Sequence, residues 1–262
     1  MAPFLESPTE HIELELDGAV ARVWLQRPPL NVLDIPMLEE LGTALDMLRA
    51  PPHLRFVVFQ GRGERGFSAG VEVRDHTPDR VGLMLERFHG VFRKLWSSDW
   101  ISVAAVHGNC LGGGMELATF CDFCVATHTA RFGQPEIKLG CFPPVAAVLL
   151  PPLVGPRRAL ELILTGRTLT AGEAHALGLA TEVVGEGELD SAVQKLIQQL
   201  QGYSPAVLGL TKKAVLRAAG LDFDKALAEM EKVYLEELMQ TADAAEGIRA
   251  FIEKRQPVWA GR

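Results

Sequence analysis

Residues 111–118 read LGGGMELA, and they constrain the chain more strongly than any other segment. They follow ISVAAV, residues 101–106, an apolar run that predicts a buried strand. The three glycines therefore lie between a strand and a helix, where backbone N–H groups at the helix N-terminus can meet a negative charge. Glu116 falls in the first turn of that predicted helix. A favourable interaction with the helix dipole would also explain an isolated glutamate at this position.

A second junction of this kind lies upstream. RFVVFQ at 55–60 predicts a buried strand, and GRGERGFSAG at 61–70 is too rich in glycine to continue a strand or a helix, so we expect a loop. Its G-x-G-x-x-G spacing imitates a dinucleotide-binding fingerprint. The helical pattern, however, starts only near Pro78, too far along the chain for a helix N-terminus to meet a pyrophosphate.

A second candidate carboxylate, Glu136, follows a proline in RFGQPEIKLG, residues 131–140, which we expect to be a loop with little regular structure. Apolar neighbours would raise the pKa of Glu136, as a proton donor near neutral pH requires. A salt bridge with a neighbouring base such as Lys138 is the alternative.

The remaining sequence predicts strands interleaved with helices. The expected elements are a hairpin at 12–25, helices over 34–48 and 81–95, short strands at 123–126 and 181–184, and a helix that begins with a capping box at Thr170–Glu173. From about residue 190 every segment reads as helical, so we place a boundary near residue 200.

Composition excludes several classes of protein. The chain has 262 residues, of which 48% are hydrophobic and 23% charged, so a packed core is expected. A formal charge of −7 argues against nucleic acid as the main partner. No apolar run approaches the ~20 residues of a membrane span, and the first residues lack the layout of a signal peptide, so we expect a cytoplasmic protein.

The four cysteines predict structural thiols. Cys121 and Cys124 form a single CxxC without a second closely spaced pair, and the sequence around Cys110 and Cys141 is mostly apolar. Reduced, buried side chains are therefore expected, with no metal site.

Taken together, FSAGVEV at 67–73, LGGGMELA and RFGQPEIKLG resemble the enoyl-CoA hydratase/isomerase (crotonase) superfamily, and the resemblance covers nearly the whole chain. It implies an α/β fold, in which residues 1–200 form a spiral of ββα units with the active site and residues 201–262 a C-terminal α-helical trimerisation region. It also implies an acyl-CoA substrate, with coenzyme A as part of the substrate and no separate cofactor.

The resemblance assigns roles to particular residues. The N–H groups of Val71 and Gly113 match the oxyanion hole that holds the thioester oxygen, and both catalytic glutamates of the family's hydratases match glutamates here. We expect Glu136 to protonate Cα and Glu116 to position and activate water. An enoyl-CoA hydratase, a hydro-lyase, is therefore predicted.

Further residues match the family's substrate-binding positions. Coenzyme A would lie along Ser68, Ala69, Gly70 and Gly112, with Arg27 near its phosphates. Phe251 and Lys254 would reach the nucleotide end, although Lys254 could equally be a solvated cation at a helix end. Homotrimers or homohexamers are expected.

One segment departs from the common hydratases. CFPPVAAV, residues 141–148, replaces their glycine-rich turn and places Pro143 and Pro144 beside the acyl pocket. This variant is similar to the cyclohexa-1,5-diene-1-carbonyl-CoA hydratases, and a rigid apolar wall suits a flat ring. A straight-chain enoyl-CoA hydratase, an enoyl-CoA isomerase and a non-catalytic CoA-binding protein are the alternatives.

Overall fold

The computed structural model describes residues 9–262. The first eight residues, on which part of the prediction about a signal peptide rests, lie outside this range. The described chain divides into two units. The first runs to Ser98 and continues from Ser102 to Gln194, and the second comprises Asp99–Ile101 and Lys195–Arg262.

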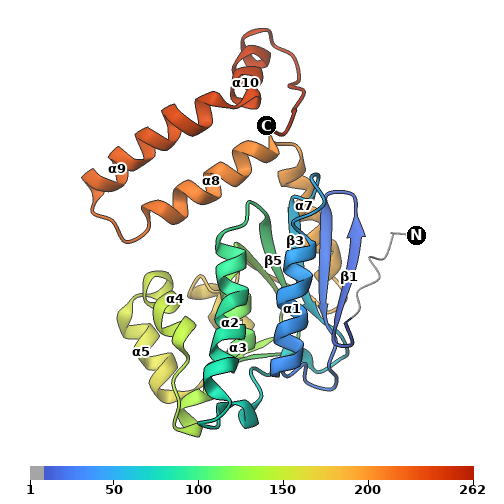
Figure 1. Cartoon of the computed structure of the whole chain (residues 1–262), viewed down its shortest axis with the longest axis vertical. Helices are drawn as coiled ribbons and strands as arrows, with labels where there is room; N and C mark the ends of the chain where they lie inside the picture. The colour runs from blue at the N-terminus through green and yellow to red at the C-terminus, as the bar shows by residue number, and fades with distance from the viewer. Residues whose placement is uncertain (1–8) are drawn as a thin grey trace. The chain divides into compact units, whose positions relative to one another are not determined.

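The first unit contains a six-stranded sheet with the strand order β1-β2-β3-β5-β7-β10. Figure 1 labels its strands β1, β3 and β5. Its strands are β1 (Ile12–Asp17), β2 (Val20–Leu25), β3 (Phe56–Gly61), β5 (Ile101–Val106), β7 (Phe123–Thr127) and β10 (Glu182–Val184). The predicted hairpin is confirmed, because β1 and β2 pair in antiparallel register, whereas β2–β3, β5–β7 and β7–β10 are parallel. Strands β3 and β5 are buried at every residue, so both faces of the sheet are covered there.

A four-stranded sheet packs in the order β4-β6-β8-β9, built from β4 (Gly66–Ser68), β6 (Asn109–Leu111), β8 (Arg131–Gly133) and β9 (Thr168–Thr170). Strands β3, β5 and β7 are each followed by one of its short strands and then by a helix, which confirms the ββα spiral. The expectation of plain loops at 61–70 and 131–140 is therefore wrong in part. Strands of three residues are too short to show a sequence period, and they form only because neighbouring turns of the spiral pair with them.

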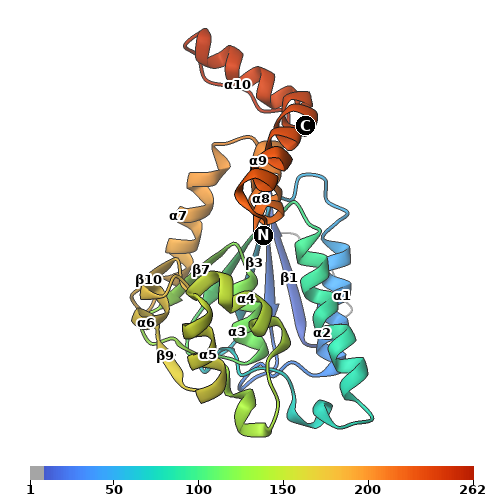
Figure 2. The same cartoon turned by 90° about the vertical axis from the view of Figure 1, so that its left-hand side faces the viewer.

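Helices cover the sheets of the first unit. They are α1 (Ile35–Met47), α2 (Val81–Trp96), α3 (Gly113–Phe120), α4 (Pro144–Val154), α5 (Pro156–Thr165) and α6 (Ala171–Ala176), with short 3₁₀ turns η1 (Val73–His76) and η2 (Pro135–Leu139). Helices α1 and α2 lie side by side, and α4 packs against α5 (Figure 2). Both bonds of the capping box predicted at Thr170 and Glu173 are present. Neither α4 nor α5 was predicted, because four prolines lie within their residues, at positions 144, 151, 152 and 156.

The second unit is helical. Helix α7 (Leu189–Gln201) leads into it, and it contains α8 (Pro205–Ala218), α9 (Phe223–Lys232), a π-helical segment η3 (Val233–Glu237), a 3₁₀ turn η4 (Leu238–Gln240) and α10 (Ala242–Ile252). The buried carboxylate of Asp243 accepts hydrogen bonds from Ser204 Oγ (2.5 Å) and from the N–H groups of Ala260 and Gly261 (2.6 and 3.0 Å). It thereby ties the end of the chain to α8 and α10. Across residues 9–262, no helix is long and apolar enough to cross a membrane.

Aromatic contacts fix α2 over α3 in the first unit. The rings of Phe88 and Phe92 meet edge to face with centroids 4.9 Å apart, and Phe92 contacts Phe120 of α3 in the same way at 5.0 Å. Such pairs combine the burial of large apolar surfaces with a favourable ring geometry. They set the position of α3, whose first turn carries Glu116.

Phe92→Ala should therefore lower the free energy of unfolding by about 3–5 kcal/mol, because it removes the central ring of this group and leaves a cavity. Chemical denaturation measures the change. Leu83→Ala, which truncates a side chain on the same helix that is 42% exposed, is the matched control and should cost less than about 1 kcal/mol. Equal losses in the two variants would contradict the proposed role of the aromatic contacts.

Candidate active site

Three glycines allow the start of α3 to approach its neighbours closely. A Cβ at Gly114 would lie 2.7 Å from the Ser68 carbonyl oxygen, and one at Gly113 would lie 2.7 Å from Val71 Cγ2 and 2.9 Å from Phe88 Cζ. Gly112 has a φ of +50°, and a Cβ there would lie 2.5 Å from Glu136 Oε1. Side chains at these positions would separate the start of α3 from the loop after β4 and from Glu136.

A pocket of about 320 Å³ opens at this junction. One wall comes from η1 and α2, another from η2 and the start of α4, and the base from the start of α3. Its lining is mostly apolar and consists of Ala69, Gly70, Val71, Val73, His76, Met84, Leu85, Phe88, Gly112, Gly113, Glu116, Pro135, Glu136, Lys138, Leu139, Phe142, Pro143 and Pro144. A concave apolar site with a few polar groups is typical of a small-molecule pocket.

Two backbone N–H groups of the lining remain available for a ligand. Within residues 9–262, neither the Val71 N–H nor the Gly113 N–H donates a hydrogen bond to a protein acceptor. The parallel bridge between Leu33 and Val71 uses the Gly70 carbonyl and the Glu72 N–H instead, and Gly113 is the first residue of α3. Two such donors beside a helix N-terminus can stabilise an oxygen that gains negative charge.

Glu116 is held by the N-terminus of α4. Its side chain is buried, with a residue exposure of 2%, and its Oε1 accepts a hydrogen bond from the Ala146 N–H at 2.7 Å. Burial raises the pKa of Glu116 to about 8, an effect opposed by this backbone bond and reinforced by the charge of Glu136. The prolines of the unusual segment 141–148 therefore begin a helix whose N–H groups meet a carboxylate.

Glu136 lies on η2 and is half-buried. Burial raises its pKa to about 7, which agrees with the raised pKa predicted from its apolar neighbours. Within residues 9–262 Glu136 forms no ion pair, so the alternative of a salt bridge is wrong. The side-chain amide of Gln134, when its nitrogen faces Glu136, donates to both carboxylate oxygens at 3.2 and 3.3 Å. Gln134 is fully buried, which holds this amide in place.

The pocket therefore contains two carboxyl groups that interact with each other and whose pKa values lie near neutrality. Such a pair can share one proton, with one member acting as an acid and the other as a base. Together with the N–H groups of Val71 and Gly113, it can add a proton and a hydroxyl group to a carbonyl-conjugated double bond.

Most of the sequence-predicted residues converge on this pocket. The predicted residues that line it are Ala69, Gly70, Val71, Gly112, Gly113, Glu116, Glu136, Pro143 and Pro144. Ser68 does not, because it is fully buried and its hydroxyl donates to the Asn31 carbonyl at 2.7 Å. Its side chain therefore supports the loop rather than facing a ligand.

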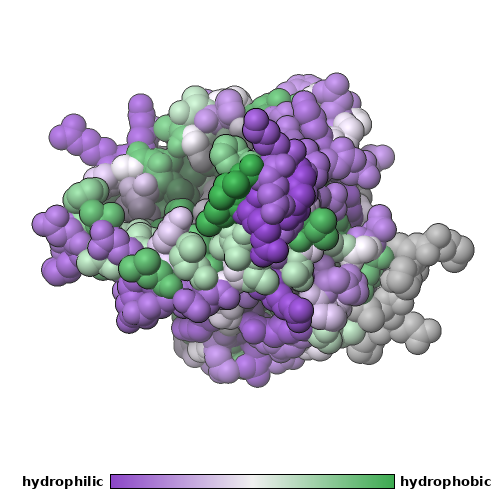
Figure 3. All heavy atoms as spheres, turned by 90° about the horizontal axis from the view of Figure 1, so that it is seen from above, coloured by the Kyte–Doolittle hydropathy of each residue, from purple (hydrophilic) through white to green (hydrophobic). Residues whose placement is uncertain are grey.

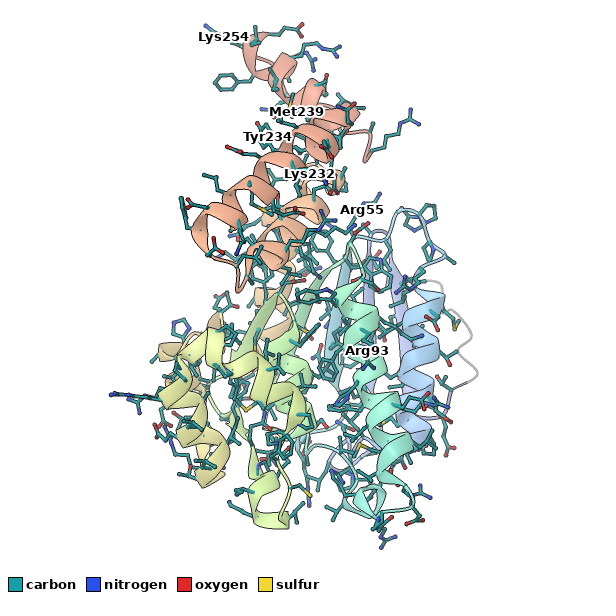
Figure 4. The ribbon with its side chains drawn as sticks, turned by 60° about the vertical axis from the view of Figure 1, so that its left-hand side comes forward. Arg55, Arg93, Lys232, Tyr234, Met239 and Lys254 are labelled. Atoms are coloured by element: carbon teal, nitrogen blue, oxygen red, sulfur yellow. The ribbon has the colours of Figure 1, made fainter. Side chains whose placement is uncertain are left out.

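The remaining predicted residues lie elsewhere. Arg27 forms an ion pair with Asp34 at 2.8 Å and donates to the Val32 carbonyl at 3.0 Å, and it is not part of the pocket lining. Phe251 and Lys254 belong to the second unit, where Phe251 is 85% exposed and Lys254 follows α10 (Figure 4). Binding of coenzyme A by these three residues stays a prediction.

Sequence reasoning missed two groups that support the carboxylates. Gln134 stands two residues before Glu136, a spacing that offers no periodic signal, and only the turn at Pro135 points both side chains the same way. The donor at Ala146 could not be found because it is a backbone N–H of an unpredicted helix. The predicted buried thiols are confirmed for Cys110, Cys121 and Cys124, whereas the expected burial is wrong for Cys141, which is only partly buried. In the described chain, no cluster of side chains could hold a metal ion.

Comparison with known proteins agrees with this geometry. The family model described as enoyl-CoA hydratase/isomerase matches residues 15–262. The cyclohexa-1,5-dienecarbonyl-CoA hydratase of Thauera aromatica is 37% identical over 249 residues, which cover 95% of this chain and 96% of that protein. The carnitinyl-CoA dehydratase of Salmonella agona is 33% identical over 262 residues, which cover 97% of this chain and all (100%) of that protein.

Solved structures show the same likeness. The enoyl-CoA hydratase subunit I of Geobacillus kaustophilus superimposes with a TM-score of 0.90 at 34% identity, covering 98% of this chain and 100% of that one. The enoyl-CoA hydratase of Bacillus anthracis gives a TM-score of 0.90 at 30% identity, with 97% and 100% coverage. With its pocket, its N–H pair and its two glutamates, the chain belongs to the enoyl-CoA hydratase/isomerase family, as a hydro-lyase of the enoyl-CoA hydratase type.

Proposed function

We propose that the protein adds water to a conjugated ring dienoyl-CoA, with cyclohexa-1,5-diene-1-carbonyl-CoA as the substrate. The observation that carries this proposal is the wall formed by Phe142, Pro143 and Pro144 where the chain departs from common hydratases. Proline rings cannot move aside as flexible side chains can, so this wall suits a flat, rigid acyl group. The 37% identity to a hydratase of that substrate supports the assignment.

The charge of the pocket favours this substrate over a carnitinyl group. Carnitine carries a quaternary ammonium, which needs an anionic or strongly electron-rich partner. The two glutamates of the lining are the groups that carry the chemistry, and the remaining charged side chain is that of Lys138, which would repel a cation. A neutral ring encounters no such repulsion.

In the proposed mechanism, the thioester oxygen accepts hydrogen bonds from the Val71 and Gly113 N–H groups. Glu116 takes a proton from water while the water oxygen bonds to Cβ, and the electron pair of the double bond moves onto the thioester oxygen. Glu136 then delivers a proton to Cα, and the two carboxyl groups exchange one proton to restore the starting state. Oxyanion donors of this kind are each worth ~10²–10³ in rate. No cofactor beyond the coenzyme A of the substrate takes part.

The environment of each glutamate bears on this division of roles. The order of the two pKa values, about 8 for Glu116 and about 7 for Glu136, would by itself make Glu116 the acid. The pKa of about 8 already includes the effect of the N–H donors of α4 on the Glu116 carboxylate. The proposed role of Glu116 as the base therefore rests on orientation, because these donors hold its carboxylate in a fixed position.

We also propose that the chain acts in the cytoplasm as a homotrimer or homohexamer that joins through its C-terminal helices. The second unit exposes large apolar side chains, among them Phe223 at 77%, Phe251 at 85% and Ile252 at 73%. Figure 3 shows hydrophobic atoms interspersed with hydrophilic ones on the face seen there. Contact with further copies would remove such surface from water.

The substrate is tested by comparing the kcat/KM for cyclohexa-1,5-diene-1-carbonyl-CoA with that for crotonyl-CoA in a spectroscopic assay. We expect a preference for the ring of about 10- to 100-fold, the discrimination that a shaped apolar pocket supplies. A preference for crotonyl-CoA would identify a straight-chain hydratase. Movement of the double bond without uptake of ¹⁸O from labelled water would identify an isomerase, and binding without turnover a non-catalytic protein.

The roles of the glutamates are separated by Glu136→Gln and its matched partner Glu116→Gln. Both variants should lose hydration by at least about 10³-fold while keeping affinity for coenzyme A thioesters. Only Glu136→Gln should also lose exchange of the Cα hydrogens of a saturated acyl-CoA with D₂O, because that exchange needs the Cα acid but no attacking water. Loss of exchange in Glu116→Gln alone would reverse the assignment.

The raised pKa values predict a bell-shaped dependence of kcat/KM on pH. Below about pH 7 both carboxyl groups are protonated and the pair has no base, and above about pH 8 both are ionised and it has no acid. The two limbs of this pH profile report the titration of the pair of carboxyl groups and not of either glutamate alone. A kcat/KM that stays constant from pH 6 down to about pH 5 would show that the carboxyl groups keep ordinary pKa values and would contradict a shared proton.

A further inference from the structure

The acyl pocket contains two ionisable side chains that the proposed mechanism does not use, one exposed and one half-buried. Four side chains of its lining carry ionisable groups, of which Glu116 and Glu136 perform the chemistry and Lys138 is exposed. The fourth is His76, half-buried on η1. Its companions on that wall, Val73 and Met84 among them, are apolar.

A buried carboxylate fixes the position of η1. Asp75, which is 2% exposed, accepts a hydrogen bond from the Ile35 N–H at 2.9 Å and pairs with Arg80 at 2.8 Å. It thereby joins the start of α1 to the residue before α2. His76 directly follows Asp75, so its backbone is held in place before a ligand binds. This reduces the entropy that is lost on binding.

The hydrogen bond of the imidazole determines which of its nitrogen atoms carries the proton. His76 Nδ1 lies 3.0 Å from the Glu72 carbonyl oxygen. A carbonyl oxygen only accepts, so Nδ1 must carry the hydrogen. In the neutral ring Nε2 is then a lone-pair acceptor, and across residues 9–262 it has no hydrogen-bond partner.

We propose that His76 is a specificity-determining residue that accepts a hydrogen bond from a hydroxyl group on the acyl ring. The inference rests on the proposed function and extends its substrate class from the unsubstituted ring to ring acyl-CoA thioesters that carry a hydroxyl group away from the reacting carbons. An acceptor in an otherwise apolar wall favours a ligand that brings a donor to it, because an unpaired polar atom is costly once a ligand excludes water.

Coenzyme A itself is a second source of donors, since its pantetheine arm carries amide N–H groups. The test therefore compares two ligands with the same arm, cyclohexanecarbonyl-CoA and its 4-hydroxy derivative. Both are saturated and do not react. Their affinities, measured by calorimetry, report on His76 even if the protein hydrates neither a ring nor a straight chain.

The wild-type protein should bind the hydroxylated ligand about three- to tenfold more tightly, the effect of one net hydrogen bond. His76→Leu should bring the ratio of the two affinities to about one or below. His76→Gln, which keeps an acceptor oxygen near the position of Nε2, should restore much of the preference. Leu85→Met, which changes the same wall without adding a strong acceptor, should leave the ratio unchanged.

Two results would overturn the proposal. An unchanged ratio in His76→Leu would show that the imidazole does not meet the ring. Equal weakening of both ligands would assign His76 to the pantetheine arm. Because Leu cannot replace the bond to Glu72, a thermal melt of each variant accompanies the titration. If the Leu variant unfolds, the ratio measured with His76→Ala decides between the same outcomes.

Discussion

The site depends on how closely the backbone at the start of α3 approaches the segments around it. Glycine at 112, 113 and 114 brings this turn against the Glu136 carboxylate, the Val71 side chain and the Ser68 carbonyl. A single methyl group at any of these positions would separate atoms that must act on one ligand. The close approach also leaves the Gly113 N–H facing the pocket, because the first residue of a helix has no partner for it.

Burial then tunes the two carboxylates that the turn brings together. Both glutamates lose hydration, which raises both pKa values toward neutrality, and each receives specific donors that limit the cost. For Glu116 the donors are N–H groups of α4, and for Glu136 the amide of Gln134. The unusual prolines at 143 and 144 therefore have two consequences, since they shape the acyl wall and begin the helix that holds Glu116.

Much of the secondary structure could be predicted where the pattern is long or the signal is local. The hairpin at β1–β2, the amphipathic helices α1 and α2, the buried strands β3 and β5 and the capping box of α6 all follow from periodicity or from one cap. The short strands β4, β6 and β8 do not, because each has three residues beside glycine and lacks both a period and a run of β-branched residues. Helix α4 was also missed, since its prolines normally interrupt a helix and are accommodated here in its first turn and near its end.

By itself, the sequence determined the pieces of chemistry: free N–H groups after glycine-rich strand ends, one glutamate in a helix's first turn and another among apolar neighbours. These are local properties, expressed within a few residues of each side chain. Only the tertiary structure decided that they share one pocket, that Ser68 faces the protein interior and that Arg27 is paired with Asp34. The reason is that contacts between turns of the spiral join residues far apart in the chain, and their distances depend on the packing of whole elements.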